Sequence, residues 1–275
     1  MIKIIADSSS NMEGLDDVVF ESVPMTIYTD EKSYKDDRSL NLRKMLDYLK
    51  NYKGRSYTSC PNIDEWVRAF EGGDIIYIVT VTSTLSGTYN AALAARNMYL
   101  EEHPDAKIEV FDSKSTGPEM HLIVEKLAEL IKAGCGFEEV VLKTRLYMKK
   151  TSLFFALSSL HNLVENGRVN RLVASALGKL GISVIAKASI IGDIKAIAKA
   201  RGEKKTVERI YEEIKKAGYH GGKIRICHVE NESIALQFIK RVREEFKDAD
   251  IQYYLSKGLC GFYAEQGGLM IGAEL

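Results

Sequence analysis

The sequence has no excess of charge of either sign, because its 275 residues include 38 Lys plus Arg and 38 Asp plus Glu. A nucleic-acid-binding domain usually carries a basic excess, so we expect no nucleic-acid partner. Hydrophobic residues make up 45% of the chain and charged residues 28%, which is ordinary for a globular protein with a buried core.

Cysteine is scarce and scattered, and the chain has neither a CxxC pair nor a Cys/His spacing that suits zinc. The four cysteines are Cys60, Cys135, Cys227 and Cys260. We therefore expect reduced thiols, no metal site and a cytoplasmic protein. The first apolar run is too short for a signal peptide. The long uncharged stretch Ile75–Ala95 is interrupted by many hydroxyl residues, so we expect no membrane insertion.

Three common signatures of enzymes and cofactor sites are also absent. There is no glycine-rich phosphate fingerprint, no GxSxG nucleophile elbow and no ligand-like pair among the five dispersed histidines. The sequence therefore indicates no cofactor, and a serine nucleophile would lack a visible base.

Short β-rich apolar runs in the first half each end abruptly in Asp, Ser or Thr. They span residues 2–6, 75–81 and 108–111, and such runs are typical of strands buried on both faces of a parallel sheet. Segments with helical spacing lie at 41–51, 63–70, 89–100 and 121–133. The alternation predicts a mostly parallel, doubly wound α/β domain over residues 1–150.

The pattern changes from about Thr151 onwards. Two apolar runs flank Gly192-Asp193 and predict a hairpin. Further strands are expected at 153–157 and 223–229 and helices at 206–216 and 232–246, while the glycine-rich segment Leu255–Leu275 is expected to return as sheet. We predict a second α/β domain over residues 151–275, and the return of the last residues to the N-terminal sheet is left open.

The loop Thr82–Thr88 follows a predicted strand and precedes a predicted helix. Ligands of open α/β sheets bind at the carboxyl ends of the strands, and a helix N-terminus favours an anion. Gly87 allows close approach of the backbone, while Ser83, Ser86 and Thr88 offer hydroxyl donors. Ser86 or Thr88 could instead merely cap the helix. Five hydroxyl residues in seven positions favour a ligand.

Other candidates are weaker. Cys60 precedes a predicted helix, whose N-terminus could lower a thiol pKa, but no histidine lies near it in the sequence. Asp7 and Asp112 end strands and could hold a metal or act as a base, although such residues more often accept loop N–H groups. The basic run Lys199–Lys205 is interpreted as a solvated turn in which Arg201 could reach an anion.

Two motifs resemble those of the DegV family. Thr58-Ser59-Cys60-Pro61 resembles its TSxP segment, and Thr82–Ala91 resembles its SSxLSGTYxSA segment. Residues 110–113, 166–169 and 199–201 also fall where that family has similar residues. The resemblance implies a two-domain α/β protein that binds one long-chain fatty acid in the cleft between its domains.

The resemblance also implies which residues hold the carboxylate. They are the hydroxyls of Thr58, Ser59 and Ser86, with Ser83, Gly87 and Thr88 beside them. Family members present the acyl group to a separate fatty-acid kinase and are not enzymes by themselves.

The chain departs from the family at Tyr263, which stands near the place of a histidine in a GxHxGPG-like segment. Tyrosine donates one hydrogen bond but is not cationic near neutral pH. We expect lipid binding to survive this change, whereas the change puts the kinase-partner role in doubt. Two rival functions remain. One is a hydrolase or phosphotransferase with Ser86 or Cys60 as nucleophile and Asp112 as helper, and the other is a binder of another small anion such as a sugar phosphate.

Overall fold

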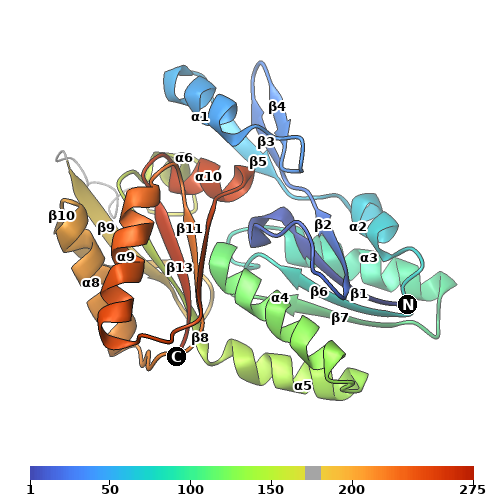
Figure 1. Cartoon of the computed structure of the whole chain (residues 1–275). Helices are drawn as coiled ribbons and strands as arrows, with labels where there is room; N and C mark the ends of the chain where they lie inside the picture. The colour runs from blue at the N-terminus through green and yellow to red at the C-terminus, as the bar shows by residue number, and fades with distance from the viewer. Residues whose placement is uncertain (171–180) are drawn as a thin grey trace.

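A computed structural model describes residues 1–170 and 181–275. Two large sheets lie side by side in it, and the helix α4 (Gly117–Lys132) packs between them (Figure 1). This arrangement puts the carboxyl ends of the first sheet's strands close to the second sheet.

The first sheet has four strands in the order β2-β1-β6-β7, and every neighbouring pair is parallel. Its strands are β1 (Ile2–Asp7), β2 (Val19–Val23), β6 (Ile75–Thr80) and β7 (Lys107–Asp112). One face packs against α2 (Ile63–Phe70) and α3 (Thr88–Glu102). The other packs against α4 and α5 (Phe137–Met148). The predicted parallel, doubly wound sheet is confirmed.

A small antiparallel sheet was not predicted from the sequence. Its order is β4-β3-β5, with β3 (Thr26–Thr29), β4 (Ser33–Lys35), β5 (Ser56–Ser59) and the helix α1 (Leu42–Asn51) beside it. The unit projects above the first sheet in Figure 1. Ile27 and Met45 bury it against Phe262 of the second half. Strands of three or four mixed residues give too short a pattern to detect.

The second sheet has six strands in the order β10-β9-β8-β13-β11-β12, and only the β11–β12 pair is parallel. Its strands are β8 (Thr151–Leu157), β9 (Ile182–Ala188), β10 (Ile194–Arg201), β11 (Ile224–His228), β12 (Ile251–Leu255) and β13 (Leu269–Glu274). Its helices include α6 (His161–Glu165), α8 (Glu203–Lys216), α9 (Glu232–Glu245) and α10 (Gly258–Ala264). The hairpin around Gly192 is confirmed as β9–β10.

Three expectations about the second half need correction. The segment Leu255–Leu275 contains the helix α10 before its strand. Its last strand, β13, pairs with β8 and β11, so the last residues do not return to the N-terminal sheet. The basic run is not one turn, because Lys199–Arg201 end β10 and α8 already begins at Glu203. Gly202, with φ +80°, makes the turn between them.

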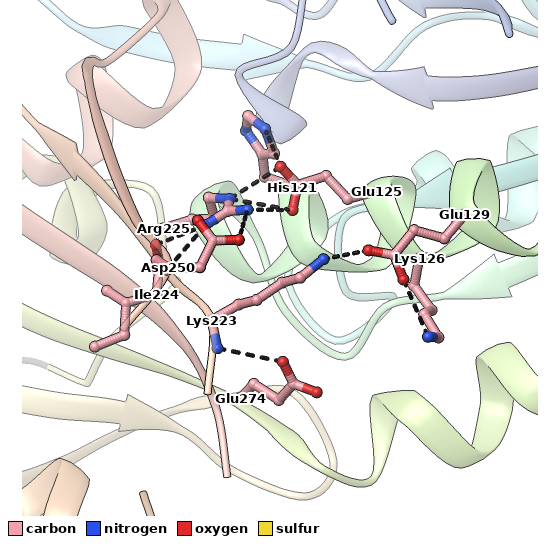
Figure 2. A network of polar contacts seen from close by, with 9 residues as sticks. All are labelled: His121, Glu125, Lys126, Glu129, Lys223, Ile224, Arg225, Asp250 and Glu274. Carbon is pink, nitrogen blue, oxygen red and sulfur yellow. Dashed lines mark hydrogen bonds and ion pairs between the residues drawn. The ribbon is translucent and has the colours of Figure 1, made fainter. Parts of the chain in front are cut away.

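Helix α4 is fixed to the second sheet by buried charge (Figure 2). The guanidinium of Arg225 on β11 donates to both carboxylate oxygens of Glu125 on α4, at 2.9 and 3.1 Å. It also donates to Asp250 at 3.1 Å, and its side chain is 2% exposed. Breaking a fully buried pair costs roughly 3–5 kcal/mol, and removing one carboxylate here costs less, because Glu125 and Asp250 are 17% and 49% exposed and the other carboxylate still pairs with Arg225. The two sheets are therefore held together along α4.

We propose the division into domains at 150/151 because α5 ends at Met148 and β8 begins at Thr151.

Candidate functional site: an apolar chamber with a polar end

A narrow chamber lies between the two halves of the chain. Of the described residues, six from the first half and ten from the second line it. Ten are apolar: Met25, Val81, Leu85, Phe155, Leu157, Leu163, Ile194, Leu259, Ala264 and Met270. The remaining six are Thr58, Ser86, Thr116, Arg168, Cys260 and Tyr263. A mostly apolar lining with a few polar groups is the usual composition of a small-molecule site.

The chamber is tight. Its volume is about 70 Å³, against roughly 300–1,000 Å³ for typical ligand sites. A long ligand therefore requires the lining side chains to move apart. Met25 and Met270 are suited to this, because methionine is unbranched and adapts its shape at little cost.

Four of the polar residues gather at one place. The hydroxyls of Thr58 and Tyr263 lie 2.7 Å apart. The guanidinium of Arg168 lies 5.8 Å from the centre of the Tyr263 ring, and its Nε donates to the carbonyl of Leu85 at 3.2 Å. Ser86 is the next residue along. Burial raises the pKa of Tyr263, so its hydroxyl stays a neutral donor. We call Thr58, Ser86, Arg168 and Tyr263 the polar end of the chamber.

Arg168 was not among the predicted site residues, although its segment resembled the family. It follows α6, and Asn166 anchors the same turn by donating to the carbonyl of Ser56 at 3.2 Å. Within residues 1–170 and 181–275, no carboxylate forms an ion pair with Arg168. The feature that identifies Arg168 is therefore that it is a partly buried cation without an acidic partner. A sequence alone shows neither burial nor ion pairing. Arg201, the predicted basic candidate, is exposed at the end of β10 and does not line the chamber.

The loop Thr82–Thr88 joins β6 to α3 as predicted, and aspartates at the strand ends hold it. Asp7 accepts from the N–H of Val81 at 2.6 Å, and Asp112 accepts from the N–H of Ser83 at 3.1 Å. Burial raises the pKa of Asp7 to about 6. The prediction that these strand-end acids bind loop N–H groups is confirmed.

The loop hydroxyls have different surroundings. Ser86 lines the chamber, and its Oγ lies 2.8 Å from Oγ1 of Thr88. It also accepts from the Thr88 N–H at 3.3 Å, which is a long hydrogen bond, and the N-cap position of α3 itself is Gly87. Ser83 lies on the other side, where the Lys114 ammonium donates to it at 3.3 Å. Ser59, Ser83, Gly87 and Thr88 are not among the residues that line the chamber in the described part of the chain.

Helix α10, which carries Tyr263, is held by the first half of the chain. The buried carboxylate of Asp36, just after β4, accepts from the N–H groups of Gly258 and Leu259 at 2.6 and 2.9 Å. Burial raises the pKa of Asp36, an effect opposed by these hydrogen bonds. Because both N–H groups open α10, Asp36 caps the helix from a distant part of the sequence.

The groups expected of an enzyme do not meet in the chamber. None of the histidines lines it, so far as the described residues define it. The carboxylate of Asp112 is bound to the Lys114 ammonium at 2.6 Å rather than to Ser86. Cys260 lines the chamber, but burial raises its pKa to about 12, so the thiol stays protonated. All four cysteines are free. In the described residues, no acidic, His or Cys cluster could hold a metal.

The structure therefore defines the class of the protein. It is an α/β protein with two large sheets, and its two halves enclose an apolar chamber with one polar end. The model for the family described as "Uncharacterised protein, DegV family" matches residues 1–274. The chain belongs to the DegV family. A DegV domain-containing protein of Streptococcus pneumoniae is 45% identical over 277 residues, covering 99% of each chain.

Two solved structures are similar over the whole chain. A DegV family protein from Eubacterium eligens, loaded with heptadecanoic acid, is 48% identical with a TM-score of 0.98 and covers 100% of this chain and 99% of its own. The Fatty Acid Kinase (Fak) B3 protein of Streptococcus pneumoniae, loaded with linoleic acid, is 45% identical with a TM-score of 0.97 and covers 99% of both. Across the described residues, no helix is long and apolar enough to span a bilayer.

Proposed function

We propose that this protein binds one long-chain fatty acid, with the carboxylate at the polar end and the tail along the apolar lining. The observation that carries the proposal is how the described lining is distributed: ten residues are apolar, while the hydroxyls gather at one place with a guanidinium that has no acidic partner among the described residues. Two similar proteins are loaded with acids of this class. The apolar lining argues against a sugar phosphate, which requires a short polar pocket.

Tail and head group contribute differently. Each buried methylene contributes roughly 0.8 kcal/mol, so the tail supplies most of the affinity. At the polar end, Thr58, Ser86 and Tyr263 offer hydroxyl donors and Arg168 offers a positive charge. A hydrogen bond to a charged group contributes about 1.5–3 kcal/mol, so the head group sets orientation and the preference for an acid.

The test is to purify the protein from a bacterial host, denature it, extract it and analyse the extract by mass spectrometry. We expect close to one fatty acid per chain, and added palmitate should bind to the delipidated protein. Finding no lipid and no palmitate binding would falsify the proposal.

We further infer that the protein acts as an acyl carrier for a separate fatty-acid kinase. Its support is the high similarity to the Fak B3 protein over nearly the whole chain. In the presence of such a kinase and ATP, the loaded protein should support formation of an acyl phosphate. If the loaded protein yields no acyl phosphate while a Fak B3 control does, the carrier role is wrong and fatty-acid binding stands by itself.

We infer that the chain has no catalytic activity alone, because no base among the described residues lines the chamber near Ser86, and Asp112 is engaged by Lys114. An acyl fluorophosphonate and an acyl chloromethyl ketone should leave Ser86 and Cys60 unlabelled in intact-mass analysis. Stoichiometric labelling of either residue would favour the hydrolase alternative.

A further inference from the structure

An open groove of about 880 Å³ lies on a different surface, between the end of α5 and the tip of the β9–β10 hairpin. Its lining includes the hydroxyl residues Ser113, Thr151 and Ser152. None of its lining residues also lines the chamber. The fatty-acid proposal therefore assigns this groove no role.

Exposed aliphatic side chains lie at the hairpin tip on one side of the groove and on α5, whose end lines the other side. Ile190 and Ile191, at the hairpin tip, are 97% and 62% exposed. On α5, Leu142 and Leu146 are 59% and 49% exposed. They share a helix face with Arg145 and Lys149, which line the groove, because positions 142, 145, 146 and 149 follow helical spacing. The two isoleucines of the rim and the two leucines of the neighbouring helix favour an interaction site here, because large exposed apolar patches mark such sites.

The groove is basic. Its lining contains five cations, Lys114, Arg145, Lys149, Lys187 and Lys195, and one carboxyl group, Glu119. Glu119 is buried and accepts from Thr151 at 2.7 Å. Lys114 pairs with Asp112, and Arg145 pairs with Glu109. In the part of the chain that the structure describes, Lys149, Lys187 and Lys195 have no ion pair. Their charge is available to an acidic partner.

The hairpin rim is held in place before any partner arrives. Oγ1 of Thr84 donates to the carbonyl of Ile191 at 2.6 Å, and the N–H of Gly192 donates to the carbonyl of Ser189 at 2.9 Å. A rim already held in its binding conformation loses little freedom on association. The hydrogen bond between Thr84 and Ile191 also joins the rim to the loop that contains Ser86.

We propose that this groove binds an acidic amphipathic helix of a partner protein. A helix about 10 Å wide that rises 1.5 Å per residue fills 880 Å³ with roughly seven residues, or two turns. Its apolar side chains contact the Ile190 and Leu146 rims, and its carboxylates face the unpaired lysines. A concave groove suits a helix better than a flat lipid surface. The inference goes beyond the acyl ligand and does not depend on it.

The experiment is a selection from a displayed random library of helical 14-residue peptides against the full chain. We expect the selected peptides to be acidic, with apolar residues at i, i+3, i+4 and i+7, and to bind with a Kd that rises with salt. Ile190→Asp and the double variant Lys187→Glu/Lys195→Glu should each weaken that binding at least tenfold. Ile190 and Lys195 are exposed and Lys187 is half-buried, so circular dichroism checks that each variant keeps the fold.

Matched controls are Leu236→Asp and Lys240→Glu on α9, which change the same residue types at exposed positions away from the groove. They should leave binding unchanged. The proposal is overturned if the selected peptides are not acidic, or if they bind the groove variants as well as the original protein. It is equally overturned if no peptide is selected while phosphatidylglycerol vesicles bind and lose binding in the same variants, since the groove then serves a lipid surface. Failure of the palmitate test leaves these outcomes unaffected.

Discussion

The hydroxyls of Thr58 and Tyr263 lie 2.7 Å apart although the residues are 205 positions apart in the sequence. One comes from the small antiparallel sheet and the other from α10, which Asp36 holds by its first N–H groups. The polar end of the chamber therefore exists only when both halves of the chain have folded against each other.

Removing either hydroxyl should weaken the binding of a fatty acid. We expect Tyr263→Phe and Thr58→Val each to raise the Kd for palmitate at least tenfold, since a hydrogen bond to a charged group contributes about 1.5–3 kcal/mol. The Kd for the matching alcohol should change less. Tyr254→Phe is the control, because the buried Tyr254 hydroxyl has no hydrogen-bond partner in the described structure. Titration calorimetry measures the Kd of all three variants for the acid and for the alcohol. Equal losses of affinity for acid and alcohol would contradict head-group recognition.

Arg168 and Arg201 offer a direct comparison between the structural and the sequence-based choice of cation. Arg168→Gln should weaken palmitate binding at least tenfold, since a charge-assisted hydrogen bond contributes about 1.5–3 kcal/mol. Arg201→Gln should have no effect, because that side chain is exposed at the end of β10. The measurement is competition with a fluorescent fatty acid. A larger loss of palmitate affinity in Arg201→Gln than in Arg168→Gln would mean that the carboxylate does not bind at the polar end.

Tyr263→His should introduce a pH dependence. Histidine has an ordinary pKa of about 6.5, so its ring becomes cationic as the pH falls, and a bound carboxylate favours that form. Palmitate affinity of the variant should therefore rise between pH 8 and pH 6, while the original protein should change little. Titrations at four pH values in constant salt decide this. Parallel pH profiles would show that residue 263 does not face the carboxylate.

Gly192→Ala should destabilise the hairpin tip. Gly192 has φ +92°, and a Cβ there would lie 2.0 Å from Oγ1 of Thr82 and 3.1 Å from the Lys114 backbone. Gly134→Ala is the matched control, since Gly134 also has positive φ but has no atom within 4 Å of the added Cβ. We expect both to lower the midpoint of thermal unfolding, and Gly192→Ala to lower it further. Equal shifts of the unfolding midpoint in the two variants would mean that the hairpin tip accommodates the added Cβ without further loss of stability.

Glu119 makes stability depend on pH. Burial raises its pKa from 4.5 to about 7, so the folded state binds its proton more tightly than the unfolded state does. The resulting stabilisation is present below about pH 4.5 and is lost as the pH rises through 7. Glu119→Gln should remove this loss, so that the variant gains stability relative to the original protein between pH 5 and pH 8. Urea unfolding at several pH values measures it. A difference that is constant with pH would contradict the raised pKa.

The first sheet was predictable because its strands are continuous apolar runs, and its loop Thr82–Thr88 combines strand end, glycine and hydroxyls in one segment. The small sheet was not, since β3, β4 and β5 are short and mixed. Helix α10 was expected as sheet because the carboxylate that caps it, Asp36, lies 222 positions away. The sequence also did not single out Arg168, because its role follows from its partial burial beside Tyr263 and from the lack of an acidic partner among the described residues.

The strand β13 lies in the middle of the six-stranded sheet, between β8 and β11, although it occupies residues 269–274. The hydrophobic core on one face of that sheet includes Leu269, Ile271 and Ala273, all from this strand. During synthesis, the ribosome must therefore add residue 274 and release that stretch before the sheet can close. Until then β8 and β11 lack the strand that pairs with both of them, and the chamber lacks Met270 of its lining, so a nascent chain has an incomplete ligand site.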